Sequence, residues 1–347
     1  MAELRLLAAG IAAGLVLREL LDYLRGGRGV LRWHARARKF APLGSGGGLY
    51  AFYSSVTDCT TTDPSLMAVP IDDHAIVRGH AVFDTCTLRD GRLYRLEIHL
   101  ERLLASAKAA RIPLPAAWDA AHFADRIAAA VAASSRRDAD VRFWLSAGPG
   151  NLGVTPAGCA TSFYVLVFGG LPLPSSWARD GIAEATVPSA VVPLKPPLLA
   201  EMKSNNYLLN VLTAMAAQDA GGTLGIQVDG DGLLRESAVL NVVVIDADGV
   251  FRTLPFDGIL RGTTVRRAME LAPGLRDEAT GRPLVRKVAQ GDVSLAAARK
   301  AKELMLVAGD THVFPITTLD GATIGDGRVG PVATALLRAL ERDAEGD

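Results

Sequence analysis

The sequence predicts a mixed α/β (α+β) protein with two domains, and three observations support this. The chain has 347 residues, which is more than one compact core usually holds. Strand-like runs alternate with amphipathic helical patterns along most of it. A proline-rich stretch at 171–181 has the composition of a linker. We therefore expect an N-terminal extension over 1–48, a smaller α/β domain over 49–172 and a larger domain over 173–347.

The first 45 residues differ in composition from the rest of the chain. An apolar run from Leu6 to Leu17 precedes a basic stretch from Arg25 to Lys39, and GSGGG at 44–48 is typical of a flexible joint. A run of about 12 apolar residues is too short for a spanning helix, which needs ~20. Three interpretations stay open for this segment: a helical extension, a targeting leader and a membrane anchor.

The smaller domain is predicted to combine strands with two helices. Strands are expected at 49–55 and 65–71, and the runs HAVFDTCTL and RLYRL form a hairpin at Asp90-Gly91. A helix is expected from Glu97 to Ala110, because its leucines fall on one face. A second helix is expected over 116–134, followed by buried strands at VRFWLSAG and SFYVLVFG.

The larger domain shows the same alternation. A helix is expected from Asn205 to Ala220, with Ser204 as its N-cap and Gly221-Gly222 at its end. Further helices are expected over 263–271, 293–301 and 331–343. Strands are expected at 181–189, 223–229, 233–237, 240–247, 250–255, 283–288 and 303–308.

Composition and charge exclude several classes of function. Lys plus Arg equals Asp plus Glu at 37 each, so no net field attracts nucleic acid or an anionic membrane. The three cysteines (Cys59, Cys86 and Cys159) form no CxxC pair, which argues against a disulfide framework and a zinc site. We expect a reducing compartment, either the cytoplasm or an organelle such as a plastid or mitochondrion.

No common catalytic motif is present in the sequence. The chain has no GxxxxGK[ST] loop, no GxGxxG after a strand, no HExxH and no GxSxG, and its six histidines show no metal spacing. Four features remain that could carry chemistry: Lys203 at a loop-to-helix junction, Arg102 on a helix, Glu236 before a buried strand, and the Gly-Thr-Thr helix start that contains Thr263 and Thr264.

A pyridoxal-phosphate enzyme needs groups of these kinds. A lysine amine forms a Schiff base with the cofactor and then moves a proton at the substrate α carbon. A carboxylate keeps the pyridine nitrogen protonated, and an arginine with helix N-terminal N–H groups binds the phosphate. Taken singly, each residue has a plainer interpretation: Lys203 as a solvated lysine, Arg102 as a surface ion-pair partner, Glu236 as a turn residue and the two threonines as an ordinary helix start.

In combination, these segments resemble the class IV aminotransferases, the fold-type-IV pyridoxal-phosphate enzymes, from about residue 50 to 339. RGHAVFDTCTLRDGRLYRLEIHLERLLASAK is similar to their hairpin and HxxRL helix, AEMKSNNYLLNVL to their lysine segment, RESAVLNVVV to their glutamate strand and GILRGTTVRRAM to their phosphate cup. The resemblance implies a cofactor cleft between the domains. It also implies the following roles: Lys203 as the catalytic lysine, Arg102, Thr263 and Thr264 at the phosphate, Glu236 at the pyridine nitrogen and Tyr207 as the phenol near the ring oxygen.

Within the family, IDDHAIVRGHAVFDT, RFWLSAGPG, PLKPP and KSNNYLLNVL are most similar to the plant-type D-amino acid aminotransferases. The loop GPGNLGVTPAGC lacks the Arg-x-His element of the bacterial D-amino acid enzymes, and Gly309 stands where branched-chain enzymes place a phosphate-binding hydroxyl. Arg78 and Arg142 are the charges left for a substrate carboxylate. For Arg142, an ion pair with a neighbouring acid is an equal alternative.

The resemblance implies a homodimeric transaminase acting between a small amino acid of the D-alanine type and a 2-oxo acid such as 2-oxoglutarate. Two enzymatic alternatives on the same fold are aminodeoxychorismate lyase and branched-chain amino acid aminotransferase. A third alternative is a non-catalytic, membrane-associated relative, for which the apolar N-terminal run is the only support.

Overall fold

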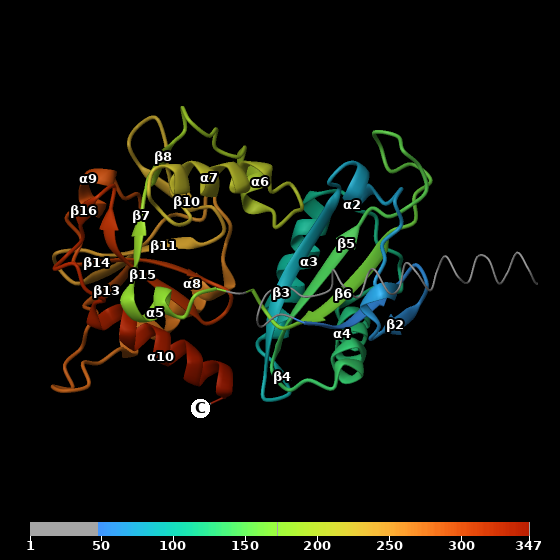
Figure 1. The fold of residues 1–347 in the computed structure, drawn as a ribbon, viewed down its shortest axis with the longest axis horizontal. Helices are drawn as coiled ribbons and strands as arrows, with labels where there is room; N and C mark the ends of the chain where they lie inside the picture. Colours follow the sequence, from blue (N-terminus) through green and yellow to red (C-terminus); the bar gives the residue numbers. More distant parts are fainter. Residues whose placement is uncertain (1–47, 172, 347) are drawn as a thin grey trace, which may run out of the picture.

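The computed structural model describes residues 48–171 and 173–346 and folds them into two lobes (Figure 1). The predicted extension lies outside the described residues except for Gly48, as does Pro172 at the predicted domain boundary. That boundary stays a prediction, although one sheet takes all its strands from before it and two sheets take theirs from after it. Among the described helices, none has the length and apolar character required to cross a membrane.

The first lobe is built on a six-stranded antiparallel sheet of order β2-β1-β6-β5-β3-β4. Helices α3 (Leu96–Ala109) and α4 (Ala120–Ser134) pack against this sheet, and η1 (Pro64–Leu66) and α2 (His74–Val77) precede β3 (Figure 1). The strands are β1 (Leu49–Ser54), β2 (Cys59–Thr61), β3 (Ala81–Arg89), β4 (Arg92–Leu93), β5 (Ala139–Ser146) and β6 (Ser162–Phe168).

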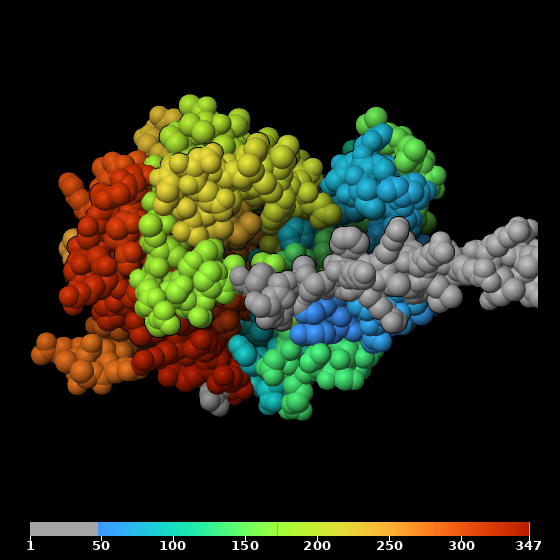
Figure 2. Space-filling model, viewed as in Figure 1, coloured from blue at the N-terminus to red at the C-terminus, as the bar shows by residue number. Residues whose placement is uncertain are grey.

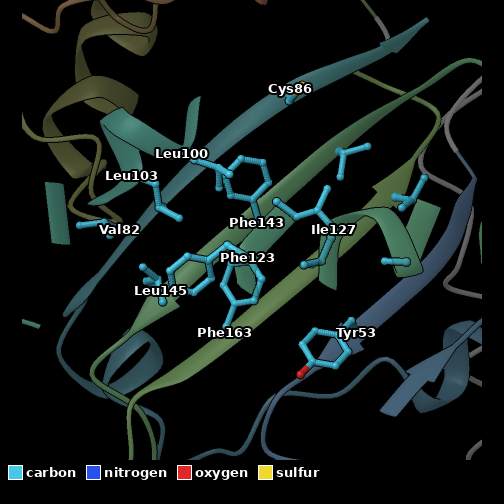
Figure 3. Close-up of a cluster of buried hydrophobic side chains, with 14 of the residues drawn as sticks. Tyr53, Val82, Cys86, Leu100, Leu103, Phe123, Ile127, Phe143, Leu145 and Phe163 are labelled. Carbon is cyan, nitrogen blue, oxygen red and sulfur yellow. The ribbon is translucent and has the colours of Figure 1, made fainter. Parts of the chain in front are cut away.

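The two faces of β3 have different neighbours. Side chains alternate along a strand, so Val82, Asp84, Cys86 and Leu88 all point toward α3, and none is more than 1% exposed. Apolar side chains fill the space between the sheet and its helices, with aromatic rings at the centre (Figure 3). The opposite face of β3 is left for the second lobe.

The second lobe contains a seven-stranded sheet of order β13-β12-β11-β14-β15-β16, with β7 paired to β15, and a three-stranded sheet β10-β9-β8. The strands are β7 (Ile182–Glu184), β8 (Thr186–Pro188), β9 (Ile226–Val228), β10 (Leu234–Ser237), β11 (Asn241–Ile245), β12 (Val250–Thr253), β13 (Lys287–Gln290), β14 (Glu303–Ala308), β15 (His312–Leu319) and β16 (Ala322–Thr323). The helices are α5 (Ser176–Asp180), α6 (Pro197–Glu201), α7 (Leu208–Asp219), α8 (Thr263–Leu271), η2 (Ala272–Gly274), α9 (Leu295–Ala298) and α10 (Pro331–Glu345).

Helices α8 and α10 cover one face of the larger sheet. Val265 of α8 and Leu336 and Leu340 of α10 are each at most 1% exposed and pack on the strand residues Val243 and Met305. The predicted helix at 263–271 and the predicted strand at 303–308 are confirmed with the same bounds. The strand predicted at 283–288 is displaced, because pairing with β12 begins only at Lys287.

Two predictions in the first half of the chain need correction. The strand predicted at 65–71 is wrong, because Pro64–Leu66 forms a 3-10 turn that the Asp63 side chain caps, and no strand follows before β3. The helix predicted over 116–134 begins only at Ala120, where the carboxylate of Asp119 accepts a hydrogen bond of 2.8 Å from the His122 N–H.

The segment around Lys203 also differs from its prediction, and here the difference matters for the site. Helix α7 begins at Leu208 rather than Asn205, and Ser204 is not its N-cap. Residues 203–205 instead extend alongside the start of β3: the Phe83 N–H donates to the Lys203 carbonyl and the Asn205 N–H to the Ala81 carbonyl, both at 2.9 Å. This long-range pairing fixes the backbone of Lys203 next to the sheet of the first lobe.

Candidate active site

A cavity of about 920 Å³ lies between the two lobes, and the space-filling view shows a recess where they meet (Figure 2). Its walls come from the outer face of β3 and β5, the segment 203–207, the end of β10, the start of α8 and the turn between β14 and β15. Seven of the eight predicted site residues line it: Arg102, Arg142, Lys203, Tyr207, Glu236, Thr263 and Thr264. Arg78 is not among them.

Lys203 has the environment of a reactive amine. Its Nζ lies 4.7 Å from the centroid of the Phe83 ring. Burial lowers the pKa of Lys203 to about 8, and the positive charge of Arg102 acts in the same direction. An amine with this pKa is partly neutral near pH 8, and the neutral form is the nucleophile and the base.

Glu236 faces Lys203 across the cavity from the end of β10. The residue is only 7% exposed, and burial raises its pKa to about 7, with Lys195 and Lys203 partly offsetting the rise. Lys195 Nζ lies 3.9 Å from Glu236 Oε2. A buried carboxylate whose charge is only partly balanced by these two lysines can accept a hydrogen bond or a proton from a ring nitrogen.

Tyr207 completes the wall beside the lysine. Its ring lies 5.3 Å from that of Phe83, at an angle of 59°. Burial raises the pKa of Tyr207, and the carboxylate of Glu236 raises it further, so the phenol keeps its proton and can donate it in a hydrogen bond.

Arg102 points from α3 toward the other lobe, and Asp84 fixes its guanidinium. Nε donates to Asp84 Oδ2 and Nη2 to Asp84 Oδ1, both at 2.7 Å. This fork leaves Nη1 without a partner among the described residues, at the wall of the cavity. Bidentate binding to Asp84 orients the planar group, and the remaining N–H groups suit an anion such as phosphate.

The first turn of α8 supplies the opposite wall. Thr263 and Thr264 are at most 9% exposed, and the helix begins directly after Gly262. A β carbon at Gly262 would lie 2.0 Å from the Asn241 side-chain oxygen, so only glycine allows this close approach. The N–H groups of a first helical turn have no intrahelical partners and attract anions.

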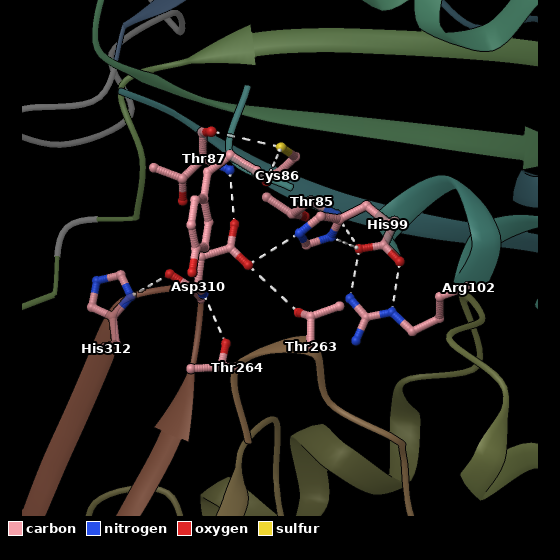
Figure 4. A network of polar contacts seen from close by, with 12 residues as sticks. Thr85, Cys86, Thr87, His99, Arg102, Thr263, Thr264, Asp310 and His312 are labelled. Carbon is pink, nitrogen blue, oxygen red and sulfur yellow. Dashed lines mark hydrogen bonds and ion pairs between the residues drawn. The ribbon is translucent and has the colours of Figure 1, made fainter. Parts of the chain in front are cut away.

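A buried charge cluster joins the two walls (Figure 4). His99 Nδ1 lies 2.9 Å from Asp84 Oδ1 and its Nε2 lies 3.1 Å from Asp310 Oδ1. Both ring nitrogens therefore lie near a carboxylate, which favours a proton on each, although only the Nδ1 contact has the alignment of a hydrogen bond. Burial alone would lower the pKa of His99, but the carboxylates of Asp310 and Asp84 outweigh it and raise the pKa to about 9. With Arg102, the cluster is neutral overall.

Cys86 also lies close to this cluster. One ligand atom from each of Cys86, His99 and Asp310 falls within 4.8 Å of the other two. The protonated nitrogens of His99 have no lone pair for a metal, and burial raises the pKa of the Cys86 thiol, whose Sγ donates to the Tyr94 carbonyl at 3.2 Å. We therefore assign the cluster as an ion-pair network.

His99 should make the stability of the protein depend on pH. Its pKa is about 9 in the fold against 6.5 as a free side chain, so its ion pairs stabilise fully below pH 6.5 and are lost as the pH rises through 9. The difference corresponds to ~3 kcal/mol. We expect His99→Gln to lower the free energy of unfolding more at about pH 6 than at about pH 10, as measured by urea unfolding.

The variant must be compared with the wild type at each pH, because Lys203 changes the stability with pH in the opposite direction to His99. Its pKa is lowered in the fold, so its share of the stability rises with pH above 8. An unfolding free energy difference between wild type and His99→Gln that is the same at both pH values would contradict the assignment of a charged His99.

The two candidate substrate arginines have different surroundings. Arg142 Nε donates to Thr85 Oγ1 at 2.9 Å, and its guanidinium lies between the rings of Phe83 and Phe168 at 5.4 and 5.5 Å. Its other nitrogens have no partner among the described residues. Arg78 is exposed, and it donates to the carbonyls of Val77, Leu152 and Gly153 outside the cavity.

Several charged residues at this site were not predicted from the sequence. Asp84, His99, Asp310, Lys195 and Asp140 were not singled out. Two of them were open to inference from pattern: His99 is three residues before Arg102 on one helix face, and Asp84 occupies an inward-facing position of β3. Asp310, in the turn after β14, has no local signal that ties it to α3.

Comparison with known proteins gives the following matches. The family model for amino-transferase class IV matches residues 81–319. The chain is 38% identical to the chloroplastic D-amino-acid transaminase of Arabidopsis thaliana over 84% of this chain and 76% of that protein. It is 28% identical to a branched-chain-amino-acid aminotransferase of Escherichia coli (78% and 86% covered) and 28% identical to the bifunctional aminodeoxychorismate lyase / D-amino acid transaminase of Mycobacterium tuberculosis (80% and 94% covered).

Solved structures give the same picture of the fold. A crystal structure of the Escherichia coli branched-chain amino acid aminotransferase superposes with a TM-score of 0.73 at 24% identity, covering 85% of this chain and 94% of that one. A hypothetical aminotransferase from Mycobacterium tuberculosis in a PLP-bound form superposes with a TM-score of 0.69 at 25% identity, covering 86% and 99%.

Proposed function

Because the chain belongs to the class IV aminotransferases, we propose that it moves an amino group between a small amino acid of the D-alanine type and a 2-oxo acid such as 2-oxoglutarate. The comparisons confirm the predicted family, the predicted fold class and the prediction of a pyridoxal-phosphate-dependent transaminase. The substrates are our proposal. It draws on the relative at 38% identity, whose name specifies D-amino acids.

The residues around the cavity fit pyridoxal 5'-phosphate. The observation that carries the proposal is that Lys203, Glu236, Arg102 and the first turn of α8 all line one cavity. We propose that Lys203 holds the cofactor aldehyde, Glu236 the pyridine nitrogen, and Tyr207 the ring oxygen. Arg102, with Thr263 and Thr264, would hold the phosphate.

Each of the residues around the cavity would have one role in the proposed reaction. Pyridoxal 5'-phosphate, when bound, supplies an aldehyde and an electron-withdrawing ring. Lys203 Nζ would take the proton from the substrate α carbon, and its lowered pKa suits this role near neutral pH. The carboxylate of Glu236 would keep a proton at the ring nitrogen, and the Tyr207 hydroxyl would donate to the ring oxygen.

For the substrate carboxylate we propose Arg142. Its outer nitrogens are free among the described residues, and its position between two aromatic rings limits its movement. Burial lowers the pKa of Arg142, yet a guanidinium stays charged at any working pH. A substrate role for Arg78 stays a prediction, since its donors are bound to backbone carbonyls away from the cavity.

The experiment that tests the proposal is a spectrum of the purified protein titrated with D-alanine and with L-alanine. We expect the visible band of the bound cofactor to fall with D-alanine and to stay with L-alanine. One equivalent of pyruvate per site should form with D-alanine alone, and more than one equivalent only when 2-oxoglutarate is supplied as acceptor. A response to L-alanine alone would refute the D-specificity. A response to branched-chain L-amino acids would favour the branched-chain alternative.

The lyase alternative keeps the same site and changes the product. Its support is the relative whose printed name combines aminodeoxychorismate lyase with D-amino acid transaminase. Incubation with aminodeoxychorismate and no amino acceptor separates the two functions, because only a lyase releases pyruvate under this condition. The non-catalytic alternative predicts a colourless protein that gives no cofactor spectrum.

We also propose a homodimer, and a face of α7 supports it. Leu208, Val211, Leu212 and Met215 lie on this helix with 70%, 50%, 39% and 54% of their surface exposed. An apolar stripe of this kind is typical of an interface between subunits. For location we propose a reducing compartment, cytoplasmic or organellar, which suits the three free cysteines.

A further inference from the structure

The phosphate cup proposed above is made from both lobes, and this raises the question of what sets its width. Arg102 belongs to α3 in the first lobe, whereas Thr263 and Thr264 begin α8 in the second. No backbone hydrogen bond joins α3 to α8 in the described residues. Side-chain contacts between the two lobes can therefore contribute directly to the distance between these two halves of the cup.

Asp310 holds the α8 half. Its backbone N–H donates to Thr264 Oγ1 at 2.9 Å, and its carboxylate lies 3.5 Å from Thr263 Oγ1 and accepts from the Thr87 N–H at 2.9 Å. Because Thr264 Oγ1 accepts the Asp310 bond, its own proton is free to point into the cavity. Asp310 follows Gly309, where the branched-chain enzymes place a hydroxyl.

Asp84 holds the arginine half through the two 2.7 Å bonds already described. His99 lies between the two carboxylates, with Asp84 on Nδ1 at 2.9 Å and Asp310 on Nε2 at 3.1 Å. Among the described residues, His99 is the one cation with a nitrogen on each of them, and it is 1% exposed (Figure 4). The chain of contacts thus runs from Arg102 through Asp84, His99 and Asp310 to the threonines.

We propose that His99 is a positioning residue that, by bridging Asp84 and Asp310, fixes the distance between Arg102 and the first turn of α8 and so shapes the cup for the cofactor phosphate. This inference rests on the proposed function of the site. His99 does not reach the cavity wall, so its effect is exerted through the groups that do. The imidazolium attracts both carboxylates and so limits how far Asp84 and Asp310 can move apart, with a directional hydrogen bond to Asp84 at Nδ1 and an ion-pair contact with Asp310 at Nε2.

His99 could instead have a general role in holding the lobes together. The two roles predict different effects on ligands with and without a phosphate. A loosened cup weakens binding of a ligand with a phosphate and leaves a ligand without it unaffected. Pyridoxal 5'-phosphate and pyridoxal form such a pair, since both offer the same ring and aldehyde to Lys203 and Glu236. A loosened lobe interface would weaken both ligands alike.

The experiment measures the affinities of the cofactor-free, full-length protein for these two compounds by fluorescence quenching. The variants are His99→Gln and Asp310→Asn. Glutamine keeps a helix-compatible side chain without charge. Asparagine tolerates the left-handed backbone at Asp310, where φ is 63°, and leaves His99 paired with Asp84. Asp310→Asn therefore still tests the proposal if His99→Gln fails to fold. The control is Tyr94→Phe, which removes the hydroxyl contact with Asp343 of α10, another tie between the lobes.

We expect both variants to bind pyridoxal 5'-phosphate at least about tenfold more weakly than the wild type does. Their affinity for pyridoxal should equal that of the wild type. The Tyr94→Phe control should bind both ligands with wild-type affinity. A wild-type ratio of the two affinities in both variants, whether binding is unchanged or equally weakened, would overturn the positioning role and leave the proposed function intact. Failure of the wild type to bind pyridoxal 5'-phosphate would overturn both proposals.

Discussion

Replacing Lys203 by alanine is expected to abolish turnover and the visible absorbance of the bound cofactor together. The amine is proposed to serve both as the attachment point and as the base at the substrate α carbon, and removal of one general base alone costs up to roughly 10⁴-fold. No other lysine lines the cavity among the described residues, although the Nζ of Lys195 lies 3.9 Å from Glu236 Oε2. The measurement is a visible spectrum together with a coupled transamination assay.

Two further lysine variants make this result specific. Lys203→Arg keeps the positive charge at the cavity wall but cannot form the covalent attachment, so it should be as inactive as Lys203→Ala. Lys300→Ala removes an exposed lysine after α9 and should leave both spectrum and rate unchanged. Retained absorbance and activity in Lys203→Ala would refute the central assignment of the site.

Glu236→Gln is expected to leave the cofactor bound while slowing proton abstraction by roughly 10²- to 10³-fold, the effect typical of losing one preorganised electrostatic group. Glutamine can hydrogen-bond a ring nitrogen but cannot keep it protonated. The measurement is a single-turnover rate with α-deuterated and α-protonated substrate, in which the isotope effect should grow as this step becomes limiting.

The stability of Glu236→Gln shows whether its slower rate comes from misfolding. Burial raises the pKa of Glu236 to about 7, which means that the fold tolerates its charge at a cost, so the neutral glutamine should not destabilise the protein. Glu341→Gln on the exposed side of α10 is the matched control. An unchanged rate in Glu236→Gln would remove the glutamate from the proposed mechanism.

Much of the fold could be predicted from the sequence where local pattern and final structure agree. Helix α8 has the predicted bounds because a glycine precedes it and apolar residues recur on its buried face. Strand β14 is likewise as predicted, since a fully apolar run flanked by charge has few alternatives. The strand β15 was not predicted, and Pro315 within it argues against a strand because proline lacks an N–H group. The proline is tolerated because the pairing of β15 with β7 begins only after it, at Ile316.

The segment at Lys203 shows why local signals can fail. Ser204 before an amphipathic run is an ordinary N-cap signal, but three residues there pair instead with the start of β3, more than a hundred residues earlier in the chain. The gain from that pairing outweighs the helical propensity, and the sequence contains no local sign of it.

The candidate site divides in the same way. The residues that face the cavity follow recognisable motifs, and seven of the eight predicted ones are brought together. The cluster behind them depends on Thr87 and Asp310 meeting across 223 positions, which no pattern along the chain records. Charged residues in supporting positions need three-dimensional contacts to be recognised.

The attachment of residues 203–205 to β3 has a consequence for how this enzyme would lose activity. The backbone of Lys203 is paired with β3 of the first lobe, while Glu236 and the start of α8 belong to the second lobe. A small opening between the lobes would thus separate the amine from its partners while the strands within each sheet kept their hydrogen bonds to one another. Inactivation by mild heat or denaturant should then precede the loss of secondary structure. Added cofactor should protect the activity, because it would bind residues of both lobes at once.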